Sequence, residues 1–178
     1  MGIIKTVKEE VCFLKLNRPK VFNSFNKDMA FSLQEELDAC ENNDAIRAIV
    51  IIGEGKAFCA GQDLVEATDP NGPDMNSIVK HHYNPIIKKI RNIEKPIIAA
   101  VNGVAAGAGA NIALSCDIVI ASQKASFIQA FSKIGLIPDS GGTFFLPRLI
   151  GFQKASSLMI TGDKIHAKEA EEMNLIYK

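Results

Sequence analysis

Residues 97–111 read IIAAVNGVAAGAGAN, a strand-like run followed by a series of small residues. Its first residues have the composition of a β-strand, Asn102-Gly103 is a turn signal, and an apolar helical pattern resumes at Ile112. Small residues at a strand-to-helix turn let main-chain N–H groups point outward at the helix start, where the helix dipole favours negative charge. Two interpretations stay open from these residues alone. One is a site for an anion or a reaction oxyanion, and the other is a tight helix–strand contact that requires small side chains.

Length and composition indicate one globular unit. The chain has 178 residues, is 47% hydrophobic and has only seven prolines, so it can form one sizeable core. Its four cysteines include no C-x-x-C pair, which disfavours a zinc site or a disulfide framework and fits a reducing compartment. Basic and acidic residues balance at 20 each, which argues against nucleic acid or an acidic membrane as partner. Without a signal peptide or a membrane-spanning run, we expect a cytoplasmic protein.

The amino-terminal residues predict a hairpin followed by a helix. Residues 3–8 and 11–16 alternate apolar and polar side chains, as in a hairpin at a sheet edge. Asn26 is a suitable N-cap for the helix that follows. The apolar face of that helix consists of Met29, Leu33, Leu37 and Cys40.

The middle of the chain alternates strands with helices. Residues 46–52 and 117–121 are apolar nearly throughout and predict strands buried in a parallel sheet. Residues 77–93 have helical spacing, with Pro85 expected to kink or break the helix. This order of elements predicts an α/β fold with a largely parallel sheet.

Few acidic residues are available for catalysis near the glycine-rich turns. Between Lys95 and Thr161 there is no Glu and no His, and the only carboxylates are Asp117 and Asp139. Asp117 opens an apolar strand, where a hydrogen-bonded structural role is the better interpretation. For Asp139, which precedes Gly141-Gly142, a helix cap and a catalytic group are equally good interpretations.

Two familiar motifs do not fit this context. Residues 139–142 read DSGG, like the end of a serine-protease nucleophile motif, but that site needs a His and a buried Asp in a β-barrel. The turn within residues 97–111 lacks the G-x-G-x-x-G spacing of a dinucleotide site.

Three segments in order resemble the successive motifs of the crotonase (enoyl-CoA hydratase/isomerase) superfamily. They are AFCAGQDL at 57–64, KPIIAAVNG at 95–103 and GLIPDSGGT at 135–143. The resemblance implies an α/β spiral of ββα turns that binds an acyl-CoA thioester and holds the thioester oxygen between two backbone N–H groups. By position, these donors would belong to Gln62 and Ala108.

Departures from the family pattern favour an isomerase. Hydratases of the family carry two catalytic Glu residues at the positions of Asn111 and Phe131, and neither residue here can move a proton. Residues 22–26, 102–110 and 127–139 are instead similar to the ring 1,2-epoxyphenylacetyl-CoA isomerases of phenylacetate catabolism. In those enzymes a single Asp, at the position of Asp139, transfers the proton.

The resemblance implies an isomerisation chemistry. Asp139 would take the acidic proton next to the thioester and return it elsewhere, converting a ring epoxide to an oxepin or a 3-enoyl to a 2-enoyl chain. One well-placed oxyanion donor is typically worth about 3 kcal/mol. An apolar wall of Phe131, Ile134 and Leu136 would raise the Asp139 pKa, whereas a helix start at Gly142 would lower it.

Further site residues and partners follow from the same resemblance. No cofactor and no metal are expected, because CoA is part of the substrate. For Lys56 a solvated loop charge, and for Asp63 an ordering of its own loop, are the alternatives to CoA binding. The residues expected to line the CoA are Ser24, Phe25, Lys56, Ala60, Gln62, Asp63 and Leu64.

The resemblance also covers the whole chain as one domain. Residues 1–178 correspond to the core domain, the amino-terminal two thirds of a typical member, with the carboxy-terminal helical part missing. Full-length members form trimers or hexamers, so a homo-oligomer is expected. Other reactions of the family, or a catalytically silent acyl-CoA-binding subunit, are the alternative functions.

Overall fold

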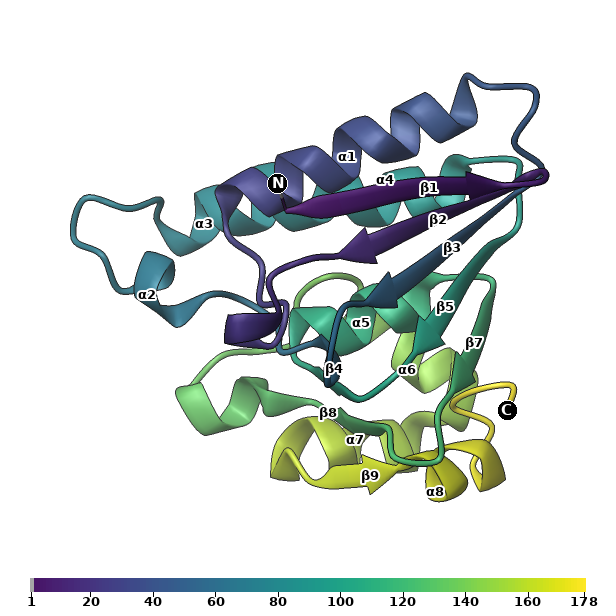
Figure 1. Cartoon of the computed structure of the whole chain (residues 1–178). Coiled ribbons are helices and arrows are strands. Elements are labelled where there is room, and N and C mark those ends of the chain that lie inside the picture. Colours follow the sequence, from purple (N-terminus) through teal and green to yellow (C-terminus); the bar gives the residue numbers. More distant parts are fainter. Residues whose placement is uncertain (1) are drawn as a thin grey trace.

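A computed structural model describes residues 2–178, and its strands form two sheets. The larger sheet has the order β1-β2-β3-β5-β7, and the smaller has the order β4-β6-β8-β9 (Figure 1). In the larger sheet only β1 and β2 pair antiparallel, and in the smaller only β8 and β9 do. The strands are β1 (Ile3–Lys8), β2 (Val11–Leu16), β3 (Ala48–Gly53), β4 (Ala57–Cys59), β5 (Ile97–Val101), β6 (Val104–Ala106), β7 (Ile118–Ala121), β8 (Ser126–Ile128) and β9 (Lys164–His166).

The chain repeats one order of elements: a strand in the larger sheet, a strand in the smaller sheet, and then helical structure. The pairs β3–β4, β5–β6 and β7–β8 each place one strand in each sheet before the chain enters helical structure. This is the expected spiral of ββα turns. The helices are α1 (Lys27–Glu41), α2 (Leu64–Ala67), α3 (Met75–Ser77), α4 (Asn84–Asn92), α5 (Ala108–Ser115), α6 (Gly142–Ile150), α7 (Phe152–Thr161) and α8 (Ala167–Glu172), with 3₁₀ turns η1 (Pro19–Val21) and η3 (Ala130–Ile134) and a π-helix η2 (Ile78–Tyr83).

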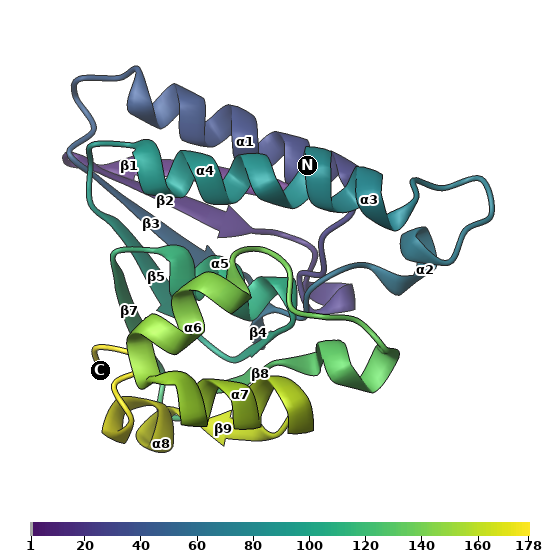
Figure 2. The ribbon, with the colours of Figure 1, turned by 180° about the vertical axis from the view of Figure 1, so that it is seen from behind.

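Helices cover one face of the larger sheet. Figure 2 shows α1, α4 and α5 in front of its strands, and every residue of α5 is buried. Asn26 caps α1 as predicted, since its side-chain oxygen accepts a hydrogen bond from the Met29 N–H at 3.1 Å. The predicted apolar face of this helix is buried in the core. No helix within residues 2–178 is long and apolar enough to cross a membrane.

Two strand predictions were wrong in detail. Residues 46–52 were expected to be buried on both faces, but β3 begins at Ala48 and alternates buried and half-buried residues. In β7, Ile118 and Ile120 are about two fifths exposed, at 43% and 41%. Both strands bury one side against the helices, and within residues 2–178 no helix lies over the other side of the sheet (Figure 1).

Two local predictions also need correction. The turn at Asn102-Gly103 does not lead directly into a helix, because the three-residue strand β6 comes first and α5 starts at Ala108. Pro85 does not break the helix of residues 77–93, although the helix changes from π to α geometry directly before it. It lies in the first turn of α4, directly after the π-helix η2, where its missing N–H removes no hydrogen bond of α4.

Candidate active site

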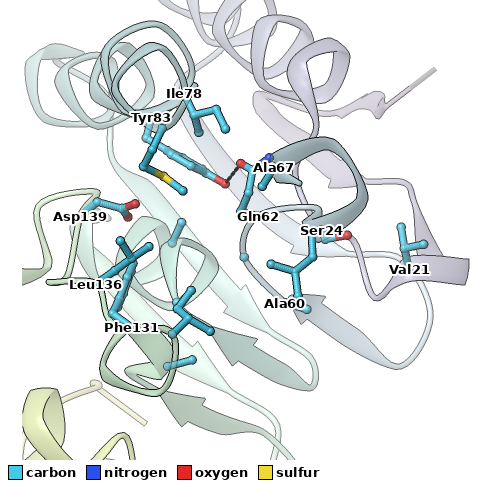
Figure 3. Close-up of a pocket in the computed structure, with 17 residues that line it drawn as sticks. Val21, Ser24, Ala60, Gln62, Ala67, Ile78, Tyr83, Phe131, Leu136 and Asp139 are labelled. Atoms are coloured by element: carbon cyan, nitrogen blue, oxygen red, sulfur yellow. Dashed lines mark hydrogen bonds between the residues drawn. The ribbon is translucent and has the colours of Figure 1, made fainter. Parts of the chain in front are cut away.

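A cavity of about 330 Å³ opens between the two sheets' loops and the helical segment that contains η2. Its walls come from segments far apart in sequence: η1, the loop after β4, α2, η2, the start of α5, and the chain from η3 to Asp139 (Figure 3). Most of the lining side chains are apolar. The lining residues are Val21, Ser24, Ala60, Gly61, Gln62, Leu64, Ala67, Met75, Ile78, Tyr83, Gly107, Ala108, Ala130, Phe131, Ile134, Leu136 and Asp139.

Asp139 supplies the one carboxylate among these lining residues. Figure 3 shows it pointing into the cavity, close to Leu136. Burial raises the pKa of this carboxyl above its ordinary value, and a 2.8 Å hydrogen bond from the Ser140 hydroxyl partly opposes the rise. Burial therefore sets the direction of the Asp139 pKa shift, and the Ser140 hydrogen bond offsets it only in part.

The backbone behind this carboxylate is held by a buried amide. The Asn111 Nδ2 donates to the Asp139 carbonyl oxygen at 2.9 Å, and Asn111 Oδ1 accepts from Gln129 Nε2 at 2.8 Å. A Cβ placed on Gly142 would lie 2.3 Å from Asn111 Nδ2, so the Asn111 amide occupies the space that a side chain at position 142 would need. Asn111 thus acts as a structural group, and it does not line the cavity.

Gln62 and Ala108, whose backbone N–H groups are the expected oxyanion donors, both line the cavity. Phe25 N–H donates to the Gly61 carbonyl at 2.7 Å, and Asp63 N–H donates to the Phe25 carbonyl at 2.8 Å. Since N–H groups alternate in direction along an extended segment, the N–H of Gln62 points away from Phe25. The second N–H belongs to Ala108, in the first turn of α5, where no intrahelical acceptor exists.

The loops that carry the two N–H groups are close neighbours. A Cβ placed on Gly61 would lie 3.5 Å from the Ala108 nitrogen. Gly61 and Gly107 both have positive φ angles, of 92° and 52°, so the chain needs glycine at these turns.

The second interpretation of the small residues, a tight helix–strand contact, is confirmed at Gly109. A Cβ on Gly109 would lie 2.4 Å from the Cys59 carbonyl oxygen, so α5 packs directly on β4. The stretch of residues 97–111 therefore combines a cavity wall at Gly107-Ala108 with a tight helix–strand contact one residue later.

The fold and this geometry agree with comparisons to known proteins. The family profile described as enoyl-CoA hydratase/isomerase matches residues 6–178. The chain belongs to this family. The 1,2-epoxyphenylacetyl-CoA isomerase of Escherichia coli (strain K12) is 47% identical over 99% of this chain and 68% of its own length. The trans-2-decenoyl-[acyl-carrier-protein] isomerase of Streptococcus mutans serotype c is 39% identical, over 99% of this chain and 68% of its own.

Solved structures of the enoyl-CoA hydratase/isomerase family give the same result. The enoyl-CoA hydratase of Bacillus anthracis superposes with a TM-score of 0.91 at 34% identity, covering 99% of this chain and 69% of that one. The chain spans about two thirds of the length of these relatives. Both hydratases and isomerases occur among them, so membership of the family does not by itself decide the reaction.

Four of the seven residues expected to contact CoA lie at this cavity. Ser24, Ala60 and Leu64 line it together with Gln62. Ala60 and Leu64 are exposed, so they can meet a ligand that enters from solvent.

The other three expected contacts do not line it. Phe25 is 1% exposed, and its N–H and C=O are both engaged by the loop of residues 61–63. Asp63 caps α2 and forms a 2.7 Å ion pair with Arg18, which holds its carboxyl pKa below the usual range against the opposing effect of burial. Lys56 lies on an exposed turn away from the cavity.

Tyr83, Met75 and Ile78 were not among the site residues predicted from the sequence. All three line the cavity from the helical segment between α2 and β5. The signal was a lone tyrosine on an apolar helical face, because a buried phenol usually needs a hydrogen-bond partner. Asp117 has the structural role that was favoured: it accepts hydrogen bonds from Ile97 N–H and from Arg91, each at 2.9 Å.

Within residues 2–178, no group of three or more His, Cys, Asp or Glu side chains could hold a metal ion. The four cysteines are unpaired by disulfides and buried. Burial raises the pKa of the Cys59 thiol to about 12, so this thiol, next to the cavity loop, is not a ready nucleophile.

Proposed function

We propose that the chain is the catalytic core of an acyl-CoA isomerase. In this proposal Asp139 moves the proton, and the backbone N–H groups of Gln62 and Ala108 hold the thioester oxygen. The observation that carries the proposal is that a single carboxylate, with a raised pKa, lines the same cavity as these two N–H groups. A reaction that needs one base and an oxyanion site fits this set of groups.

The chemistry begins with the C–H bond next to the thioester carbonyl. Asp139 removes that proton, and the electron pair moves onto the carbonyl oxygen to give an enolate. Hydrogen bonds from preorganised backbone donors stabilise the charge as it develops, typically by about 3 kcal/mol for each donor. Because burial raises the pKa of Asp139, the carboxylate is a stronger base than an exposed aspartate.

Return of the same proton to another carbon completes the isomerisation. For a 3-enoyl chain the double bond moves to the 2-position, and no atoms are gained or lost. For a ring 1,2-epoxide of phenylacetyl-CoA, the C–C bond shared by the epoxide and the six-membered ring breaks while the oxygen stays bonded to both carbons, which expands the carbocycle to an oxepin. The proton removed beside the thioester returns to a ring carbon, so no atoms are gained or lost. The relative that is 47% identical is named for the epoxide substrate, which supports 2-(1,2-epoxy-1,2-dihydrophenyl)acetyl-CoA as the first substrate to test.

Hydration is the main alternative within the family. Adding water requires a group that activates the water and a group that delivers a proton. By resemblance these groups would occupy the positions of Asn111 and Phe131. Here Asn111 is buried and hydrogen-bonded at both ends of its amide, and Phe131 is an apolar wall residue. A catalytically silent acyl-CoA-binding subunit is the remaining alternative, and a homo-oligomer, trimeric or hexameric, is the assembly we propose for the full-length protein.

Product analysis separates these functions. The full-length wild type, Asp139→Asn and Asp44→Asn are incubated with cis-3-hexenoyl-CoA, with trans-2-hexenoyl-CoA and with the ring epoxide of phenylacetyl-CoA. We expect 2-enoyl and oxepin products from wild type and from Asp44→Asn, whose altered side chain is on the exposed turn before β3. Asp139→Asn should give neither product. A 3-hydroxyacyl product from the 2-enoyl substrate would make the chain a hydratase, and binding without any product would favour the silent subunit.

A further inference from the structure

Tyr83 is the largest of the fully buried side chains, and it lies on the wall of the cavity. Its ring packs edge-on against Phe25, with centroids 6.0 Å apart and an interplanar angle of 65°. Its hydroxyl donates a 2.8 Å hydrogen bond to the Gln62 Oε1, as Figure 3 shows. The phenol proton is therefore directed at the residue whose backbone N–H we assign to the oxyanion site.

The helix that carries Tyr83 has an unusual geometry at this point. Residues Ile78–Tyr83 form a π-helix, and α4 starts immediately afterwards. A π-turn adds a residue to the helical turn, which rotates the residues after it by about 100° relative to a continuous α-helix. Such turns are rare and occur frequently at functional sites. Here the π-turn ends on the one residue that reaches across to Gln62.

The side chain of Gln62 is held at both ends. Its Oε1 accepts from Tyr83, and its Nε2 donates to the Glu66 Oε2 at 3.0 Å. The other oxygen of Glu66 accepts from the N–H of Lys27, the first residue of α1, at 2.8 Å. A chain of hydrogen bonds thus runs from the π-helix through the cavity loop to the start of α1.

The backbone of this loop needs such support. Gly61, directly before Gln62, has a φ of 92°, in a region of backbone conformation that glycine adopts readily and other residues rarely adopt. On the Phe25 side the loop is held by the backbone hydrogen bonds of Gly61 and Asp63. The Gly61 carbonyl, which lies opposite the Gln62 N–H in the same planar peptide, is held by Phe25 N–H. On the cavity side, within residues 2–178, the other end of this unit, the Cα of Gln62, is held through the side-chain contacts to Tyr83 and Glu66.

We propose that Tyr83 is a positioning residue that acts through the side chain of Gln62 to aim the Gln62 backbone N–H at the thioester oxygen. The inference rests on the proposed function, because it assigns that N–H to the enolate. Small errors in the direction of a donor reduce its effect on the transition state much more than they reduce ligand binding. Loss of the phenol proton should therefore lower kcat and leave KM nearly unchanged.

The test compares Tyr83→Phe with Tyr177→Phe in the full-length protein. The chain has two tyrosines, and Tyr177 is 75% exposed, so its variant controls for loss of a phenol elsewhere. We expect Tyr83→Phe to lower kcat for cis-3-hexenoyl-CoA isomerisation by about tenfold, with KM changed less than about threefold. Tyr177→Phe should match wild type in both constants.

A spectroscopic readout reports on the donor itself. The absorption of bound 4-(dimethylamino)cinnamoyl-CoA moves to longer wavelength when hydrogen bonds polarise its thioester carbonyl. We expect a clear red shift with wild type and Tyr177→Phe, and a smaller one with Tyr83→Phe at saturating protein. A purely structural role for Tyr83 would change stability without changing the red shift of the bound probe, and that result would overturn the proposal.

A double-mutant cycle tests the route through Gln62. Gln62→Met keeps the backbone N–H and nearly the same side-chain volume but removes the acceptor of the Tyr83 hydrogen bond. If Tyr83 acts through this side chain, Tyr83→Phe adds nothing further to the kcat loss of Gln62→Met. Fully additive losses contradict the proposal. Should Tyr83→Phe fail to fold, Gln62→Met alone must reduce the red shift, because the Tyr83 ring is then intact.

The failure of the proposed function looks different. If wild type gives neither a red shift nor isomerisation, the proposed oxyanion site is contradicted, and the proposed role of Tyr83 is contradicted with it. A normal wild type beside an unchanged Tyr83→Phe overturns the positioning role alone.

Discussion

The side-chain amide of Asn111 donates a 2.9 Å hydrogen bond to the backbone carbonyl of Asp139. The two residues are 28 positions apart, and this contact joins the buried helix α5 to the segment that carries the one carboxylate among the residues lining the cavity. The resemblance assigns this position to proton transfer in hydratases, whereas in this chain Asn111 holds the backbone of the proposed base.

Asn111→Asp should destabilise the protein by about 2–4 kcal/mol at neutral pH. The change removes the donor to the Asp139 carbonyl and places a buried carboxylate against that oxygen, so two unfavourable effects combine. Urea denaturation measures the free energy of unfolding. Asn43→Asp is the matched control, because the Asn43 side-chain oxygen accepts from Ala45 N–H on an exposed turn and an aspartate can do the same. An equal effect of both variants would contradict the structural role of Asn111.

The raised pKa of Asp139 predicts a pH-dependent stability. The folded protein binds a proton at this carboxyl more tightly than the unfolded chain does, so the stability from this group falls as pH rises through the folded-state pKa. Asp139→Asn should therefore be more stable than wild type at pH 7, and the difference should vanish below about pH 3, where both states are protonated. Thermal denaturation at several pH values checks this. If Asp139→Asn is less stable than wild type at pH 7, burial does not destabilise the charged form of Asp139.

Asn23 predicts a large effect of a single buried amide. It is fully buried with a φ of 56°, its Nδ2 donates to the Glu54 and Ala57 carbonyls at 2.9 and 2.8 Å, and its Oδ1 accepts from Arg18 N–H. Asn23→Ala should lower the free energy of unfolding by about 2–4 kcal/mol, because several buried groups lose their partners.

Asn174 provides the control for backbone strain. It has a similar φ of 62°, but its side chain is exposed. Asn174→Ala should therefore cost only about 1 kcal/mol, the penalty of a left-handed backbone for alanine. Both variants are compared by urea denaturation, and similar losses would mean that the hydrogen bonds of Asn23 contribute little.

Gly109→Ala should destabilise the protein by about 3 kcal/mol or prevent folding. The added Cβ would lie 2.4 Å from the Cys59 carbonyl oxygen, so α5 must move away from β4. Gly135→Ala is the comparison, because a Cβ there meets nothing within 4 Å and only the positive φ of 71° is unfavourable. That variant should cost about 1–2 kcal/mol. Circular dichroism with thermal melting distinguishes the two.

The sequence predicted those elements whose signals are local. The hairpin of residues 3–16 follows from alternation along each strand, and α1 follows from the Asn26 cap and an apolar face at helical spacing. The strand β6 was missed because its three residues, Val104–Ala106, carry no pattern of their own and are held by β4 and β8, which lie far away in sequence.

Residues that belong to a sequence motif were correctly predicted to line the cavity. Residues whose position depends on packing were not. Asp139, Gln62 and Ala108 were found from ordered motifs and do line one cavity. Phe25 was expected to lie beside them, but its side chain is buried in the core. The direction of the Asp139 pKa and the reach of Tyr83 across to Gln62 depend on burial and on a π-turn, and neither has a signature in a single sequence.

Exchange of the acidic proton next to the thioester isolates the first proposed step, because it needs only the base and the oxyanion donors. Phenylacetyl-CoA is incubated in D₂O with the full-length wild type, Asp139→Asn or Asp44→Asn, and deuterium at the carbon beside the carbonyl is followed by mass spectrometry. We expect wild type and Asp44→Asn to exchange at equal rates, and Asp139→Asn to be slower by about 100-fold or more. Exchange at the wild-type rate in Asp139→Asn would show that another group takes the proton and would contradict the account.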